Sequence, residues 1–466
     1  GNPAAILIIE LAEQTHEKVN LKADEIEEDL KAHYYGIYYS RVYGKDIDRV
    51  WSLRKAGLGL LSGMPGDAKP VSLIEDTAIA PYRLAAYITD MKKMLSKYGL
   101  NCIYHGHIST GELHLRPVLN LKEDKDRKLF RIVASETAML VKKHRGTLSG
   151  EHGDGRLRGE FISLLLGEKV YGLLRDLKET WDGSHIFNIG KIVDTPPMDT
   201  YLRYEQYIFK TKTYFDFSRQ KGWLCAIEQC NGSGDCRKLN QSGGTMCPSY
   251  RATKDERNST RARANILREL LIHPLGDKVF SQPEILEILD TCISCKACKA
   301  ECPSNIDMAR FKAEYLQHHY DESRVPFRTW LIANLADVQK SAMIAPWLYN
   351  AFVTNGITAV ILKHILQFAP QRSIPKLYKM SLRTWLHSNP TTQDCARKVY
   401  VFADEFTNYM DVEIGIKFIK LLRALGYDVM IPEHIESGRT ELSKGLLKKA
   451  KKIAEKNIAL LKDVVT

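Results

Sequence analysis

Residues 292–303 read CISCKACKAECP and carry four cysteines at the spacing C-x2-C-x2-C-x3-C, followed directly by proline. In such a run the first three thiolates bind one [4Fe–4S] cluster, and the fourth binds the second cluster of a pair. A structural zinc site needs only four ligands, usually as two separated pairs. The spacing therefore favours iron and sulfide over zinc and predicts a ferredoxin-like electron-transfer domain.

A second cysteine group lies upstream, with the spacing C-x4-C-x5-C-x10-C-P over residues 225–248. Two Cys-Pro ends predict two clusters. The ligand exchange of two-cluster ferredoxins predicts one cluster on Cys247, Cys292, Cys295 and Cys298, and the other on Cys225, Cys230, Cys236 and Cys302. Cys225 stays open between a ligand and a buried apolar cysteine, because its interval is long. The isolated Cys102 and Cys395 are expected to be small buried apolar residues.

The composition is that of a globular protein of about three domains: 466 residues, 44% hydrophobic and 26% charged. Ten cysteines are too few for a disulfide scaffold, and the N-terminus lacks the basic region and cleavage site of a secretory signal, which predicts a cytoplasmic protein. The net charge is +11, but the basic residues are interspersed with acidic ones along the chain. Net charge is the only feature that favours nucleic-acid binding, and we expect no such binding.

Outward from the cysteines we expect an α+β fold in four parts: 1–203, a dicluster domain over 204–320, a helical segment over 321–390, and a partial βαβ unit over 391–466. In the first part, residues 4–11 and 70–76 favour strands, whereas 80–99 and 126–146 favour helices. Residues 351–368 are the most apolar stretch, but Asn355, Lys363 and His364 interrupt it. Buried or membrane-surface helices are expected there, and peripheral contact with the inner face of a membrane is left open.

Two polar motifs in the first part are candidates for chemistry. HGHISTGELHLRP (105–117) places His107 and His114 seven residues apart, and SGEHGDG (149–155) is too rich in glycine for a helix interior and predicts a loop close to a ligand. Two imidazoles and a carboxylate suit zinc, manganese, iron or cobalt, with zinc slightly favoured. The alternative is that these histidines only form hydrogen bonds within their loops.

The segments 51–61, 66–78, 105–117, 149–155 and 187–194 resemble, in this order, the C-terminal substrate domain of FAD-linked oxidases of the vanillyl-alcohol oxidase type. More narrowly, they resemble the D-lactate, glycolate and D-2-hydroxyglutarate dehydrogenases. CNGSGDCRK (230–238) and CISCKACKAECP are similar to the iron–sulfur module of the large bacterial D-2-hydroxyacid dehydrogenases, and the tail resembles the start of their cysteine-rich Cys-Cys-Gly domain.

This resemblance implies oxidation of a D-2-hydroxy acid such as D-lactate, with hydride passing to FAD and single electrons leaving through two clusters to a quinone or a carrier protein. It also implies residue roles: a divalent metal on His107, His114 and Glu151, His152 as general base, Arg54 and Lys69 on the substrate carboxylate, and Asn188 and Lys191 near the flavin. An alternative class is an electron-transfer subunit without a substrate of its own.

The chain also departs from the family pattern. Relatives that bind a second substrate carboxylate carry a hydroxyl residue where this chain has Leu58 and an Asn where it has Arg116, which argues against a dicarboxylate substrate. Ile189 replaces a usual proline, and Glu436-Ser437-Gly438 lacks the two thiols of the first Cys-Cys-Gly position. Because nothing before Leu7 supplies an FAD-binding domain, we expect a fragment that binds flavin weakly or not at all by itself.

Overall fold

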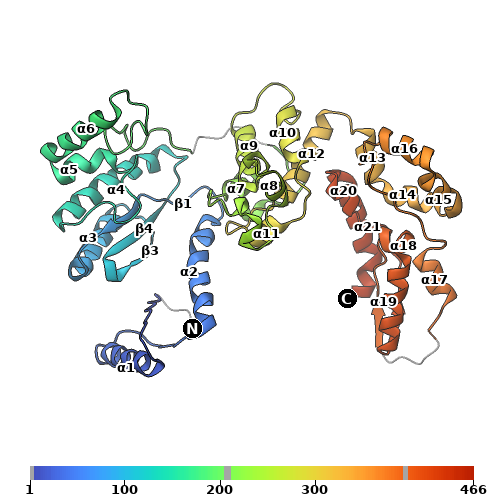
Figure 1. Ribbon diagram of the computed structural model, residues 1–466, viewed down its shortest axis with the longest axis horizontal. Coiled ribbons are helices and arrows are strands. Elements are labelled where there is room, and N and C mark those ends of the chain that lie inside the picture. Colours follow the sequence, from blue (N-terminus) through green and yellow to red (C-terminus); the bar gives the residue numbers. More distant parts are fainter. Residues whose placement is uncertain (1–4, 204–210, 392–396, 466) are drawn as a thin grey trace. The chain divides into compact units, whose positions relative to one another are not determined.

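The computed structural model describes residues 5–203, 211–391 and 397–465, and the chain divides into two compact units, Gly1–Leu58 and Gly59–Thr466 (Figure 1). The first unit contains α1 (His16–Ala32) and most of α2 (Ile47–Ser62). Helix α1 begins after Thr15, whose side-chain oxygen accepts the Lys18 N–H at 3.3 Å and so caps the first turn.

The strand expected over residues 4–11 is wrong. Residues 5–11 have no regular structure, and Ile6 and Leu7 are 75% and 63% exposed. An apolar run forms a strand only where a partner strand takes up its N–H and C=O groups, and no pairing of this run is present among the described residues.

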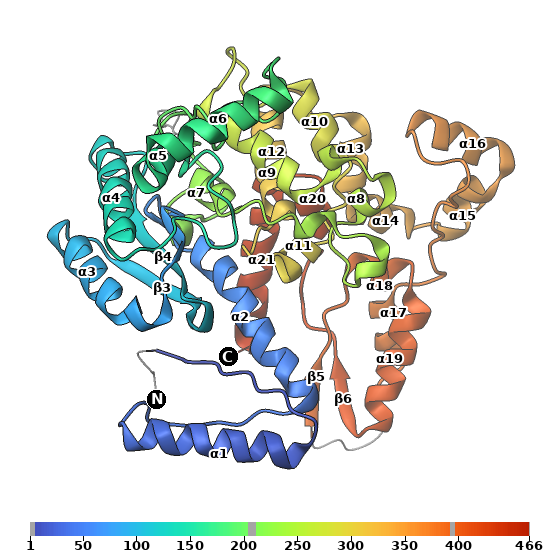
Figure 2. The ribbon, with the colours of Figure 1, turned by 60° about the vertical axis from the view of Figure 1, so that its left-hand side comes forward.

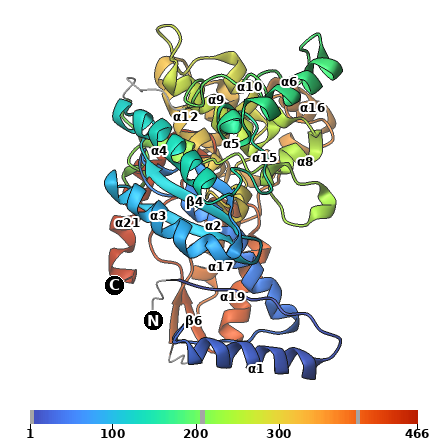
Figure 3. The same ribbon diagram turned by 90° about the vertical axis from the view of Figure 1, so that its left-hand side faces the viewer.

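The second unit opens with a four-stranded sheet of β1 (Lys69–Pro70), β2 (Ile74–Ala78), β3 (Cys102–His107) and β4 (Glu112–Leu119). Strand β4 pairs antiparallel with each of the other three, so it is the centre of the sheet. Helices α3 (Leu84–Lys97) and α4 (Asp124–Lys143) pack against each other, and α4 also contacts β2 and β4 (Figure 3). Their buried apolar side chains, such as Tyr87 and Val133, form one core with Leu115 of β4. Two further helices follow, α5 (Ile162–Leu166) and α6 (Glu168–Asp182).

The cysteine-rich part is helical. It contains the second hydrophobic core of the chain, in which cysteines of both groups are buried. Its helices are α7 (Trp223–Glu228), α8 (Pro248–Thr253), α9 (Thr260–Ile272), α10 (Pro283–Asp290), α11 (Ala297–Glu301) and α12 (Met308–Glu322). Arg263 of α9 is fully buried and joins the two groups: it donates to Cys247 Sγ (3.6 Å) and Ser249 Oγ (3.0 Å) on one side, and to Thr291 Oγ1 (2.6 Å) and Ile288 O (3.0 Å) on the other.

Five helices follow: α13 (Phe327–Ala333), α14 (Leu335–Ala342), α15 (Pro346–Thr354), α16 (Gly356–Ile365) and α17 (Leu382–Ser388). The tail contains β5 (Arg397–Tyr400), α18 (Glu405–Tyr409), α19 (Val412–Ala424), β6 (Tyr427–Met430), α20 (Arg439–Ser443) and α21 (Leu447–Val465). Strands β5 and β6 are parallel and α19 packs on β6, which confirms the expected start of a βαβ unit (Figure 2). None of the helices in the described ranges has the length and hydropathy needed to cross a membrane.

We predict that Arg263→Ala destabilises the cysteine-rich part by about 3 kcal/mol, because it removes several hydrogen bonds to a buried cation at once. Urea unfolding of the metal-free protein, followed by circular dichroism, measures the change. Arg257→Ala is the matched control, because the exposed Arg257 pairs only locally, with Asp255 at 2.7 Å, and its loss is expected to cost less than about 1 kcal/mol. Equal effects of the two variants would contradict the role given to Arg263.

Candidate functional site

Strand β4 has one polar and one apolar face. Leu113 and Leu115 point into the core, whereas Glu112, His114 and Arg116 alternate with them on the other face. All three polar residues are nevertheless buried. A polar face at the centre of a sheet is costly unless each group has a partner or a ligand, so this face is a candidate site.

The neighbouring strands extend the polar face. On one side of β4, His107 and His105 of β3 pair with Glu112 and His114, respectively. On the other side, Glu75 of β2 pairs with His114. Because directly paired residues point to the same face, the four side chains gather around His114. His107 and His114 lie seven residues apart in the sequence, and the turn between β3 and β4 brings them together.

The glycine-rich loop 149–155 has no helix or strand and is tied to the sheet by one side chain, Asp76. The Asp76 carboxylate accepts the backbone N–H of Glu151 (2.9 Å) and of His152 (3.0 Å), as well as the Ser149 hydroxyl. Its backbone carbonyl accepts the Gly150 N–H at 2.8 Å. Asp76 is fully buried and has a φ of 79°, at a register shift in β2 that turns its side chain toward the loop.

This anchoring brings the predicted metal ligands together. Glu151 Oε1 lies 3.8 Å from His107 Nε2 and 3.5 Å from His114 Nε2, and one ligand atom from each residue lies within 4.8 Å of the others. The His114 Nδ1 atom is buried, and none of the residues that the structure describes forms a hydrogen bond with it. Burial is the main cause that lowers the pKa of His114, which favours the neutral imidazole that binds metals. The donor set therefore fits a divalent metal such as zinc.

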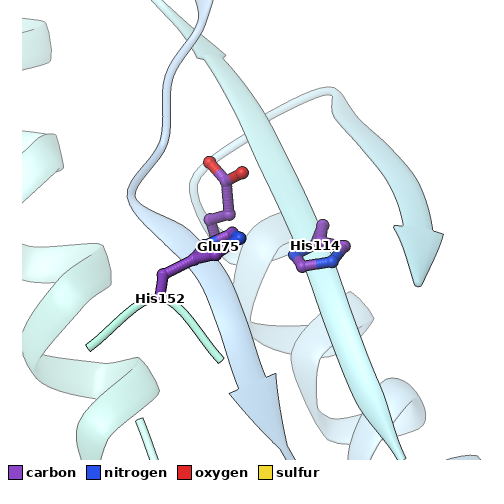
Figure 4. Close-up of side chains that lie close together, drawn as sticks. All are labelled: Glu75, His114 and His152. Atoms are coloured by element: carbon purple, nitrogen blue, oxygen red, sulfur yellow. The ribbon is translucent and has the colours of Figure 1, made fainter. Parts of the chain in front are cut away.

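His152 adjoins this group. Its Nε2 lies 3.4 Å from Glu151 Oε1, and its ring stacks on His114 with centroids 5.3 Å apart. Glu75, His114 and His152 form a second set whose ligand atoms lie within 4.8 Å of one another (Figure 4). His114 is common to both sets and is thus the centre of the site.

Three carboxylates near the loop, Glu75, Asp76 and Glu112, were not predicted from the sequence. The adjacent Asp76 is the largest cause that raises the pKa of Glu112, to about 7, whereas hydrogen bonds from Glu112, Ser149 and the loop outweigh burial and lower the pKa of Asp76. Glu75 pairs with Arg116, its Oε1 lying 2.5 Å from Arg116 Nη2. The β-bulge that turns Asp76 toward the loop cannot be recognised in a single sequence. Glu75 can be recognised as a site residue only once the register of β2 is known.

The remaining predicted residues lie elsewhere. Lys69 of β1 pairs with Leu119, five positions along β4 from His114, or about 17 Å of strand. Its ammonium donates to the Met64 carbonyl, and burial is the main cause that lowers its pKa. Arg54 lies on α2 in the Gly1–Leu58 unit.

The two residues expected near the flavin lie in the loop after α6. Both are exposed, and Lys191 Nζ donates to Asn188 Oδ1 at 3.2 Å. Exposed apolar residues flank them, Ile186 at 69% and Phe187 at 65%. This loop is therefore an exposed surface of apolar and hydrogen-bonding groups, and its contact with a flavin stays a prediction.

The cysteines form separate groups. Cys247, Cys292, Cys295 and Cys298 line one small cavity, which matches the set predicted for one cluster. Burial would raise the pKa of Cys247, but the Ser249 hydroxyl and Arg263 outweigh it and lower that pKa, which favours the thiolate. Cys230, Cys236 and Cys302 are close enough for Cys302 to act electrostatically on both of the others.

Cys225 has different surroundings. Its Sγ lies 3.4 Å from Asp67 Oδ1, and Lys122 bridges Asp67 and Glu228 at 2.7 Å each. Burial, and then Asp67, raise the pKa of Cys225 to about 11, which favours the neutral thiol. Its role as a ligand stays a prediction. Cys102 is half-buried on β3, and Cys395 lies outside the described residues.

Comparison with known proteins gives two domain matches. Residues 2–192 match the model of the FAD linked oxidases, C-terminal domain, and residues 229–307 match a 4Fe-4S dicluster domain. The D-2-hydroxyglutarate dehydrogenase of Escherichia coli (strain K12) is 28% identical over 96% of this chain and 48% of its own length. The D-lactate dehydrogenase of Archaeoglobus fulgidus is 30% identical over 36% of this chain and 37% of its own length.

A third relative, the glycolate oxidase subunit GlcD of Bacillus subtilis, is 23% identical over 31% of this chain and 31% of its own length. The chain spans about half the length of the D-2-hydroxyglutarate dehydrogenases it matches. The two domain matches agree with the fold and with the cysteine spacing. The chain therefore joins a C-terminal domain of the FAD-linked oxidases to a 4Fe-4S dicluster domain.

Proposed function

We propose that the protein containing this chain oxidises a D-2-hydroxy acid and passes the electrons through two [4Fe–4S] clusters to a quinone or a carrier protein. The observation that carries the proposal is the convergence of His107, His114, Glu151 and His152 on the polar face of the sheet. The two domain matches and the names of the relatives support it.

The side chains of this group have two proposed roles, metal binding and proton transfer. His107, His114 and Glu151 would hold a divalent metal, with zinc favoured by two imidazoles and one carboxylate. When bound, the metal lowers the pKa of a substrate hydroxyl, FAD accepts hydride, and the clusters carry single electrons. His152 accepts the hydroxyl proton at its imidazole, and the Glu151 carboxylate 3.4 Å away stabilises the imidazolium that results.

The cysteines and the outer residues complete the proposal. One cluster would bind to Cys247, Cys292, Cys295 and Cys298, and Cys230, Cys236 and Cys302 would bind the other, with Cys225 as the open fourth position. Asn188 and Lys191 would contact the flavin from their exposed loop. Arg54 stays the proposed cation for the substrate carboxylate. Lys69 stays a prediction, because its position about 17 Å along the strand from His114 gives the assignment no support.

The pair of Arg116 and Glu75 bears on the substrate. Both side chains are nearly buried, and the Glu75 carboxylate already neutralises the guanidinium. A second substrate carboxylate would have to displace Glu75, at the cost of leaving a buried carboxylate unpaired. The structure therefore favours a monocarboxylate such as D-lactate, although the relatives that match most of the chain are D-2-hydroxyglutarate dehydrogenases.

Substrate-driven reduction tests the function. In the full-length protein with FAD, we expect anaerobic D-lactate to bleach the flavin at least about tenfold faster than D-2-hydroxyglutarate, measured by stopped-flow absorbance. The reverse order would overturn the preference for a monocarboxylate. If dithionite reduces the clusters but none of the hydroxy acids reduces the flavin, the chain is part of an electron-transfer relay without its own substrate.

His152→Ala tests the base. We expect the rate of flavin reduction to fall by about 10²- to 10⁴-fold, with the metal content unchanged, because only proton removal is lost. Added imidazole should restore part of the rate, which a purely structural defect would not allow. His33→Ala, at the exposed end of α1, is the control and should leave the rate unchanged. Normal turnover by His152→Ala would refute the assignment.

Glu151→Gln and Glu75→Gln separate the two possible ligand sets. We expect Glu151→Gln to weaken zinc binding by at least about 100-fold, because it removes a ligand charge, whereas Glu75→Gln should retain the metal. Elemental analysis and competition with a fluorescent chelator measure this directly. His114→Ala should lose the metal with either set. Active wild-type protein that contains iron but no second metal would contradict the site.

A further inference from the structure

Helices α15 and α16 form a hairpin whose outer side is apolar and exposed. The two helices contact chiefly each other. On α16 the exposed residues follow the helical repeat, at Ile357, Val360, Ile361 and Ile365. On and before α15 they are Ile344, Trp347, Leu348 and Phe352, with Ile344 90% and Trp347 72% exposed.

The hairpin is an ordered element with its own interior. Val353 of α15 and Ala359 of α16 are buried, as are Leu366 and Leu377 in the segment that follows α16. Asn350 of α15 holds the segment after α16, since its side chain donates to the Leu377 carbonyl and accepts the Leu377 N–H, both at 2.8 Å. The exposed apolar residues are therefore not the ones that stabilise the hairpin, because other apolar residues are buried for that purpose.

Charge distinguishes this region from the rest of the chain. From Val338 to Gln393 the sequence has no Asp or Glu, although the whole chain has 56 of them. The same stretch carries six cations: Lys340, Lys363, Arg372, Lys376, Lys379 and Arg383. An apolar surface that includes Trp, in a stretch of chain that carries cations and no acidic residues, complements an anionic lipid surface.

We propose that the α15–α16 hairpin docks on the surface of an anionic lipid bilayer, with both helices in the plane of the interface. At 9 and 10 residues the helices are about 15 Å long, half the hydrocarbon thickness, so they enter one leaflet without crossing it. The aromatic and aliphatic side chains enter the acyl region and the cations contact headgroup phosphates. This inference does not depend on the proposed reaction.

Vesicle flotation with the full-length protein tests the hairpin. We expect the wild type to float with phosphatidylcholine vesicles that contain about one third phosphatidylglycerol, and to float much less with phosphatidylcholine alone or in high salt. The double variant Trp347→Gln/Ile361→Asn should bind the anionic vesicles at least about tenfold more weakly, and Lys376→Glu about fivefold more weakly.

The matched control changes α21, a lysine-rich helix outside the hairpin. Ile458→Asn/Lys451→Glu alters an apolar residue that is 71% exposed and a lysine whose side chain is 74% exposed, both on α21, and should leave flotation unchanged. Unchanged cluster absorbance and circular dichroism would show that the variants are folded. Wild-type protein that does not float, or a double variant that floats like the wild type, would overturn the proposal. A lipid-free dimer that the double variant dissociates would instead assign the hairpin to protein contacts.

Discussion

One buried carboxylate, that of Asp76, fixes the geometry of the candidate site. It accepts two consecutive backbone N–H groups and a hydroxyl from the glycine-rich loop, and thereby places Glu151 and His152 over His114 of the central strand. A loop with three glycines in seven residues has high conformational entropy, so it holds a defined position only if strong contacts compensate for that entropy. Hydrogen bonds to a buried charge are the strongest available here, and the surrounding positions follow from them.

Much of the architecture could be predicted because it depends on local pattern. The helices α3 and α4, the two strands of the tail and the grouping of Cys247 with the downstream cysteines all follow from periodicity or from a fixed ligand spacing. The failure at residues 5–11 has the opposite cause. An apolar run shows which residues tend to be buried, but strand formation also needs a partner strand, which lies elsewhere in the chain.

The sequence predicted the principal residues of the candidate site, but not the residues that hold them in position. His107, His114, Glu151 and His152 lie in two motifs whose glycines and histidines mark them as candidates, and the structure brings all four together. Glu75 and Asp76 were missed because their importance depends on the register of β2 and on a bulge that turns Asp76 toward the loop. Lys69, in contrast, was predicted as a site residue, but its partner on β4 lies far along that strand from His114.

The contacts of Arg263 bear on how the cofactors are installed. Its guanidinium touches Cys247 of the upstream group and Thr291, the neighbour of Cys292 in the downstream group. With the proposed exchange of ligands, each cubane draws thiolates from both segments, so neither can be completed while one segment is still unfolded. Cluster insertion would then follow the folding of both segments, and a substitution that unfolds either segment would prevent both clusters from assembling.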